Sequence, residues 1–348
     1  KVYTGAADMS GNTMASAFTS AFETAVNAVP PDPDDDNTVI KLVFVGDINL
    51  GTKVGESVVS NGGGDYNFLF APVASYIQSF DLAFGNLESI ISDRGTTTKP
   101  YMGVDLRADP DSVNGLAGAG FDVVSVANNH AGDFGEDGMV DSFNRLTAAG
   151  IGFAGGGLNY DAARKPVIRD VKGTKVACLS YTNIPMYMDS YYAGQIPTSR
   201  WIATDSRPGI AWAHDTRFEN YGDISDMTAD IRAARAIADV VVVMMHFGWE
   251  YKYQPDQAQQ DLAHAAIDAG AALVIGHHPH VCQKIEQYKG GFIAYSLGNF
   301  VFDISEAMAE GATRGMAVEA TFTDGKLTNV HTRSTSINEY YQVSLIEE

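Results

Sequence analysis

Three histidines stand within four residues in the segment Gly-His-His-Pro-His at positions 276–280, directly after the apolar run AALVI. The whole chain of 348 residues has only eight histidines, so this short segment holds a large share of them. Neutral imidazole is the commonest metal ligand in proteins. The segment is therefore either a metal-binding loop or a solvated polar turn, and the rest of the sequence must decide between them.

Polar side chains also follow five other apolar strings of the chain. Because ligands bind at the carboxyl ends of the strands in open α/β sheets, these residues are candidates for one shared site. Carboxylate and imidazole together suit zinc, manganese or iron, so we expect one or two such divalent ions. The six groups of polar residues are Asp47 and Asn49; Asn86 and Glu88; Asn128, Asn129 and His130; His246 and Glu250; His277, His278 and His280; and Ser296 and Asn299.

The apolar strings themselves predict the elements that position these side chains. They are rich in Val, Ile and Leu without alternation, which is typical of strands buried on both faces. The strings are IKLVFV, FDLAF, FDVVSVA, KVACLSY, DVVVVMM, ALVI and FIAYSL, and helices are expected at about 67–79, 110–118, 136–149, 226–238 and 256–269. This alternation predicts a layered α/β fold. The dipeptide Asp324-Gly325 predicts a closing β-hairpin.

The first 39 residues differ from the rest of the chain. Residues 1–29 have Phe18, Phe22 and Val26 at a four-residue spacing, which predicts an amphipathic segment, and residues 30–39 form an acidic, proline-rich linker before the domain at 40–348. Residues 1–39 could dock on the domain or on another copy, which leaves a homo-oligomer open. The chain begins at Lys1 instead of Met, so we expect that a leader was removed from an exported protein.

Charge and composition exclude several classes of function. The formal net charge of -20 repels nucleic-acid phosphates, so we expect no nucleic-acid partner. No run of about eighteen apolar residues occurs, so we expect no transmembrane segment. The hydrophobic content of 45% is sufficient for a large folded core.

Motifs in their order along the chain resemble one known family. The order is Asp-x-Asn at 47–49, Gly-Asn-x-Glu at 85–88, Asn-Asn-His at 128–130, His246, and Gly-His-x-x-His at 276–280, with the longer strings ANNHAGDFGEDGM, HFGWEY, IGHHPHVCQ and YSLGNFVFD. From residue 40 to at least 303, the chain resembles the CapA (PgsA) family of poly-γ-glutamate capsule biosynthesis proteins, a divergent branch of the calcineurin-like metallophosphoesterases. The resemblance implies a four-layer αββα sandwich of two mixed sheets flanked by helices, in an extracellular or envelope-associated protein.

The resemblance also implies roles for individual residues. His130 would be the acid or electrostatic stabiliser beside Asn129, an amide ligand. The other metal ligands would be Asp47, Glu88, His246, His278 and His280, with Asn49, Asn86, His277, Glu250 and Asn299 as further candidates. Two positions depart from the superfamily pattern: Asn49 replaces a histidine, and Asn86 replaces the aspartate that bridges two metals. Both are poorer ligands, so the number of ions stays open.

Two functions remain open at this point. The chain could be a metal-dependent phosphoesterase-like hydrolase or transferase acting on an anionic polymer or a phosphorylated small substrate, with Arg94, Lys99 and Arg107 contacting that substrate. It could instead be a non-catalytic component that assembles the capsule or binds the polymer. Asn49 and Asn86 favour the second hypothesis, and the six groups of polar strand ends favour the first.

Overall fold

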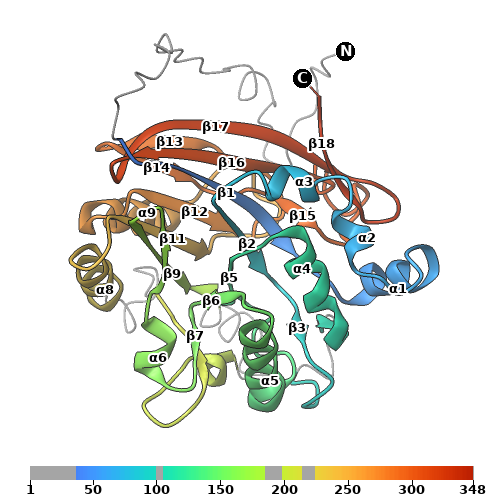
Figure 1. Cartoon of the computed structure of the whole chain (residues 1–348). Coiled ribbons are helices and arrows are strands. Elements are labelled where there is room, and N and C mark those ends of the chain that lie inside the picture. The colour runs from blue at the N-terminus through green and yellow to red at the C-terminus, as the bar shows by residue number, and fades with distance from the viewer. Residues whose placement is uncertain (1–36, 99–104, 185–197, 214–223, 348) are drawn as a thin grey trace. The chain divides into compact units, whose positions relative to one another are not determined.

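The computed structural model describes residues 37–98, 105–184, 198–213 and 224–347 (Figure 1). The predicted amphipathic segment 1–29, most of the linker and Lys99 lie outside the described residues. Residues Thr38–Glu348 form one compact unit, and the description below concerns this unit alone.

Two large mixed sheets form the centre of the unit. The first, called sheet one here, has the strand order β18-β17-β16-β1-β2-β5-β6, with β15 beside β1. Strands β2, β5, β6 and β15 belong to its parallel part, whereas β16, β17 and β18 pair antiparallel. The bounds are β1 (Val39–Ile48), β2 (Leu82–Leu87), β5 (Val123–Ser125), β6 (Gly152–Ala154), β15 (Asn299–Val301), β16 (Arg314–Thr323), β17 (Lys326–Ile337) and β18 (Val343–Leu345).

The second sheet, called sheet two, has the order β13-β14-β12-β11-β9-β8. Its four central strands are parallel and its two edge strands are antiparallel. The bounds are β8 (Val167–Val171), β9 (Thr174–Thr182), β11 (Val240–His246), β12 (Leu273–His277), β13 (Ile285–Tyr288) and β14 (Gly291–Ala294). Two small pairs complete the strands: β3 (Ile90–Ile91) with β4 (Arg107–Ala108), and β7 (Gly156–Gly157) with β10 (Gly209–Ile210).

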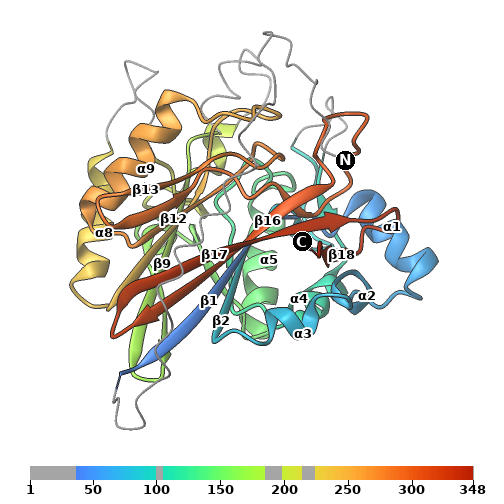
Figure 2. The same ribbon diagram turned by 90° about the horizontal axis from the view of Figure 1, so that it is seen from above.

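The two sheets pack face to face, and helices cover the outer face of each (Figure 2). Successive side chains of a strand point to opposite faces, so the central strands contribute to two cores. On β1, Leu42 and Phe44 lie in the core between the sheets, whereas Val43 packs with the helices beside sheet one. On β11, Val242 lies between the sheets and Val241 faces the helices beside sheet two. The predicted four-layer αββα sandwich is confirmed.

The helices agree with the sequence in most places. Beside sheet one lie α1 (Thr52–Asn61), α2 (Asn67–Phe70), α3 (Ala74–Ile77), the 3₁₀ helix η1 (Pro110–Ser112), α4 (Val113–Ala119) and α5 (Gly135–Ala148). The others are α6 (Tyr160–Arg164), η2 (Thr198–Trp201), α8 (Ser225–Arg235) and α9 (Gln257–Ala269). The single helix expected at 67–79 is divided into α2 and α3, because Pro72 has no amide hydrogen for a continuous helix. Helices α1 and α6 were not predicted.

The expected hairpin joins β16 and β17. Asp324 and Gly325 have positive φ angles of 51° and 73°, as the favoured two-residue hairpin turn requires. Among the residues that the structure describes, every helix is too short or too polar to span a lipid bilayer.

Candidate metal centre

The ends of five strands bring polar side chains together between the sheets. On sheet one, Asp47 pairs in register with Asn86 of β2 and with Asn299 of β15. On sheet two, His246 and His277 stand opposite each other at the ends of β11 and β12. All five residues are fully buried. Residues separated by more than 200 positions in the sequence therefore meet in one buried cluster.

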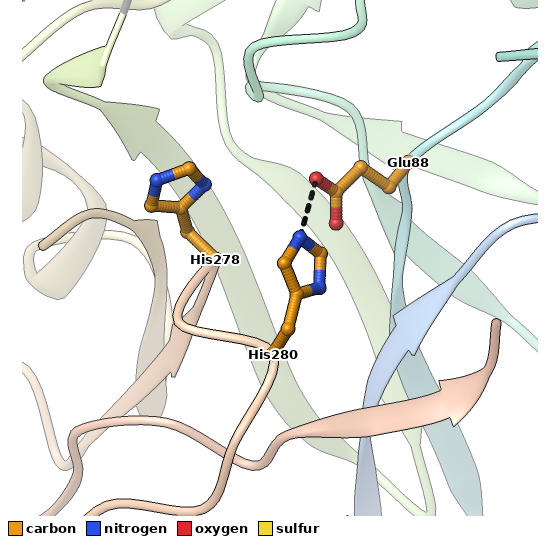
Figure 3. Close-up of side chains that lie close together, drawn as sticks. All are labelled: Glu88, His278 and His280. Atoms are coloured by element: carbon orange, nitrogen blue, oxygen red, sulfur yellow. Dashed lines mark ion pairs between the residues drawn. The ribbon is translucent and has the colours of Figure 1, made fainter. Parts of the chain in front are cut away.

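Two groups of three side chains in this cluster have the spacing of metal ligands, and they share Glu88. One triad is Glu88, His278 and His280, and the other is Asp47, Glu88 and His246; in each, the three ligand atoms lie within 4.8 Å of one another. Figure 3 shows the Glu88 carboxylate facing His280. The Oε1 atom of Glu88 lies 3.8 Å from Nε2 of His280 and 3.5 Å from Nε2 of His246. The Glu88 carboxylate is therefore close to the histidines of both triads.

His277 contacts Asp47 but belongs to neither triad. Its Nδ1 atom is 3.2 Å from Oδ1 of Asp47. The same carboxylate accepts hydrogen bonds from the Asn86 amide at 2.8 Å and from the backbone N–H of His278 at 3.2 Å. These contacts fix the orientation of Asp47. Of the three histidines in the loop, His278 and His280 belong to a triad with ligand spacing, whereas His277 contacts Asp47 outside both triads.

Protonation of the cluster suits cation binding. Burial alone would raise the pKa of Asp47, but His277, His280 and Asn86 outweigh it and the pKa is lowered from its ordinary value. Burial, followed by the charge of neighbouring imidazoles, holds the pKa of His246 well below its ordinary value. Burial is also the main cause that lowers the pKa of His278 to about 4. Neutral imidazoles beside ionised carboxylates are the forms that bind zinc, manganese or iron, so this donor set fits such an ion.

Asn86 and Asn49 have different surroundings. Asn86 lies inside the cluster, where its Nδ2 atom donates to Asp47 and, at 3.3 Å, to Oε2 of Glu88. Asn49 lies outside both triads. Its Oδ1 accepts the backbone N–H of Gly51 at 2.9 Å, and its Nδ2 donates to Thr52 and Asp303, so it fixes the turn that leads into α1.

The segment after β5 adds Asn129 and His130 to the site. The Oδ1 atom of Asn129 lies 2.6 Å from Nε2 of His246, so this amide oxygen faces the second triad. His130 is buried, and its Nδ1 atom lies 2.7 Å from Oδ2 of Asp133. Asp133 is itself fully buried and also accepts the backbone N–H of Leu106 at 2.8 Å. Sequence reasoning missed Asp133, although a carboxylate three residues after a candidate histidine was a usable signal.

Asn299 supports the histidine loop from the side of β15. Its Oδ1 atom lies 2.9 Å from Nδ1 of His280, while its Nδ2 donates to the carbonyl oxygens of His280 and Ala312. The side chain thus holds both the ring and the backbone of His280. Glu250 lies farther out and is exposed, and its negative charge partly opposes the lowering of the His278 pKa.

The described arginines expected to bind substrate lie in the segment that packs beside Asp133. Arg94 is 68% exposed and its Nε atom is 3.4 Å from Oδ1 of Asp141. Arg107 donates to the carbonyl oxygens of Arg94 and Gly95, and its guanidinium stacks on Phe134 at 3.6 Å. These contacts engage the Arg107 guanidinium within the protein. A substrate-binding role for Arg94 and Arg107 stays a prediction, and Lys99 lies outside the described residues.

The backbone of the histidine loop is strained at two positions. His278 and His280 have positive φ angles of 95° and 56°, which residues with a side chain adopt rarely. Just before them, Gly276 is so close to the residue that follows β14 that an added Cβ atom would lie 2.1 Å from the carbonyl oxygen of Tyr295. Strain of this kind persists where the surrounding structure enforces it, and it clusters at functional sites.

Comparisons with known proteins agree with the motifs. The sequence model of the family described as bacterial capsule synthesis protein PGA_cap matches residues 41–304. The capsule biosynthesis protein CapA of Bacillus anthracis is 35% identical over 279 residues, which cover 79% of this chain and 63% of that protein. The PGA biosynthesis protein CapA of Bacillus subtilis is 34% identical over 266 residues, which cover 76% of this chain and 64% of that protein.

The chain thus spans slightly less than two thirds of these two relatives. Among solved structures, that of a phosphatase from Mycoplasma pneumoniae has a TM-score of 0.48 and 12% identity, covering 86% of this chain and 94% of that one. The family match covers all the residues of both triads. The chain belongs to the bacterial capsule synthesis protein PGA_cap family.

Proposed function

We propose that this protein acts in the synthesis of a capsule or cell-envelope polymer of the poly-γ-glutamate type, as an exported or envelope-associated protein. The names of the two Bacillus relatives, which refer to capsule and PGA biosynthesis, support this role. We further propose that the buried cluster is the site of a metal-dependent hydrolase or transferase. The observation that carries this second proposal is the pair of buried triads that share Glu88.

One or two divalent ions of manganese, zinc or iron are the proposed cofactor. Asp47, Glu88 and His246 would hold an ion on one side, and Glu88, His278 and His280 on the other. A bound ion would polarise a phosphoryl or carbonyl oxygen and lower the pKa of bound water. It would also supply positive charge in a chain with a net charge of -20, which otherwise repels an anionic substrate.

The proton chemistry in this proposal belongs to His130. Its contact with Asp133 fixes the orientation of the ring and engages Nδ1. In this proposal, Nε2 is the ring nitrogen that exchanges a proton with the leaving group of a substrate. Asn129 has a separate role, because its Oδ1 contacts His246 and so lies beside the triads.

Metal content and turnover together test the proposed function. Protein purified without chelators is expected to contain about one or two equivalents of metal by mass spectrometry and to hydrolyse a phosphoester or a γ-glutamyl polymer. His246→Ala is expected to lose both properties. His264→Ala is the matched control, since His264 pairs with Glu286 at 2.8 Å outside the cluster. If the wild-type protein binds no metal even after reconstitution, the enzyme proposal is wrong and polymer binding without turnover replaces it.

A further inference from the structure

The loop that follows β11 is tied to the histidine loop by three hydrogen bonds. The backbone N–H of Phe247 donates to the carbonyl oxygen of His277 at 3.2 Å, and that of Tyr251 donates to Pro279 at 2.8 Å. The Gln283 side chain donates to the carbonyl oxygen of Lys252 at 2.7 Å. The position of Tyr251 relative to His278 and His280 is therefore set by backbone contacts.

The Tyr251 backbone itself has a rare conformation. Its φ angle is 61°, in the left-handed region that His278 and His280 also occupy. A bulky residue in this region is a genuine outlier, and a loop of this shape would be less strained with glycine. Outliers of this kind cluster at functional sites, so Tyr251 is a candidate for a functional role.

The Tyr251 ring lies at the edge of the metal cluster. Its centroid is 6.1 Å from that of His280, and the Phe302 ring is 4.7 Å from His280. Tyr251 is half-buried against a small apolar cluster that contains Phe302 and Ile304. The apolar contacts hold the ring, while part of the side chain stays accessible to a ligand.

The Tyr251 hydroxyl has no hydrogen-bond partner among the described residues, in contrast to other tyrosines nearby. Tyr253 donates to the carbonyl oxygen of Glu310 at 2.8 Å, and Tyr295 donates to Glu286 at 3.0 Å. Burial, with the negative charges of Glu250 and Glu88, raises the pKa of Tyr251 to about 12. The hydroxyl therefore remains protonated, and a hydrogen-bond donor, at neutral pH.

We propose that Tyr251 is a substrate-binding residue whose hydroxyl donates a hydrogen bond to an anionic oxygen, such as that of a phosphoryl group, held at the two triads. This inference rests on the proposed metal site and adds to it a hydrogen-bond donor for the substrate. Arg107 already donates to backbone carbonyls, and Arg94 already contacts Asp141, so an uncharged donor close to the triads is well placed to contribute.

The experiment compares Tyr251→Phe with Tyr253→Phe, using inorganic phosphate as the probe. Both variants remove one hydroxyl from the same loop, but the Tyr253 hydroxyl donates to the carbonyl oxygen of Glu310, whereas the Tyr251 ring lies 6.1 Å from that of His280. Each protein is loaded with Mn²⁺, its metal content and thermal midpoint are measured, and phosphate binding is followed by titration calorimetry. Tyr251→Phe is expected to weaken phosphate binding about tenfold or more at unchanged metal content, because a hydrogen bond to a charged group is lost. Tyr253→Phe is expected to bind phosphate as the wild type does.

Three results would overturn the inference. Equal phosphate affinity in Tyr251→Phe and wild type would remove Tyr251 from the site and leave the proposed function intact. Loss of metal or of folding in Tyr251→Phe would show that the hydroxyl supports the histidine loop instead of a ligand. Absence of phosphate binding in the metal-loaded wild type would contradict the proposed phosphoryl substrate itself.

Discussion

Sheet one supplies the buried cluster mainly with oxygen atoms, whereas sheet two supplies it with nitrogen atoms. Asp47, Glu88 and Asn129 lie at or just after the ends of strands of sheet one, and His246 and His280 lie at or just after the ends of strands of sheet two. The carboxylates bring negative charge, while burial favours neutral imidazoles. A complete donor set exists only where the two sheets pack together, so the proposed metal site depends on the packing of the whole sandwich.

The two sheets also hold their donors in different ways. On sheet one, amide side chains connect the donors: Asn128 donates to Asn86, which donates to Asp47 and Glu88. On sheet two, the backbone holds them, through the positive φ angles of His278 and His280 and the close approach of Gly276 to the backbone of Tyr295. Side-chain substitutions that preserve shape should therefore displace the donor side chains of sheet one more than those of sheet two.

The largest expected effect comes from Glu88→Gln. Glu88 belongs to both triads, so its loss should reduce bound metal more than His280→Gln, which affects one triad. We expect a loss of affinity beyond the roughly 10- to 100-fold that removal of an outer partner causes. Metal content and titration with Mn²⁺ measure it, with Glu286→Gln as a control outside the cluster. If His280→Gln lost more metal than Glu88→Gln, the shared role of Glu88 would be wrong.

Asp133→Asn should impair the proton transfer proposed for His130, which lies on the side of sheet one, without removing the metal. The asparagine preserves shape but no longer favours the ring tautomer with hydrogen on Nδ1 of His130. We expect turnover to fall roughly 10²-fold or more at unchanged metal content. Two-bond ¹H–¹⁵N NMR spectra report the tautomer directly.

Asp141→Asn is the matched control for this variant. It also changes a buried carboxylate, one that pairs with Arg145 at 2.7 Å, without contact to His130. An equal loss of turnover in both variants would indicate a general effect of removing a buried charge and would contradict the orienting role of Asp133.

His277→Gln sharpens the distinction between ligand and supporting histidine on sheet two. Because His277 contacts Asp47 and lies in neither triad, we expect metal affinity to fall by about 10- to 100-fold, less than in His278→Gln. Competition with a chelator of known affinity measures both variants. If His277→Gln lowered metal affinity more than His278→Gln, His277 would be the metal ligand in place of His278.

The sequence predicted the strands well, because each buried strand is a local run of apolar residues. All seven apolar strings became strands of the two sheets. Five of the polar residues at or after their ends form the two triads, whereas Asn49 lies outside both triads and Glu250 is exposed. The choice between His277 and His278 could not be made in this way. It depends on contacts with Asp47, more than 200 residues away, and on the positive φ of His278, which periodicity does not indicate.

Helix boundaries and supporting residues were harder to predict for a similar reason. Helix α1 has glycine at position 55 and several β-branched residues, so its sequence is a weak helix signal; it is held by packing of Val54 and Val58 on sheet one. Asp133 and Tyr251 each acquire significance only from a contact made in the folded chain, with His130 and with Pro279 respectively.

The smallest expected effect is that of Arg94→Ala. Arg94 is an exposed candidate for substrate binding on the side of sheet one. Its exposed contact with Asp141 at 3.4 Å is weaker than that of Arg145 with the same carboxylate, so Arg94→Ala should change the free energy of unfolding by less than about 1 kcal/mol. If Arg94 attracts an anionic substrate, phosphate affinity should fall a few-fold at low salt and recover at high salt, because salt screens exposed charges. Arg333→Ala is the control, since it removes an exposed positive charge that pairs with Glu319 on β16. Both variants change the net charge equally, so a difference between them measures the position of the charge, and equal affinities would exclude Arg94 from the substrate site.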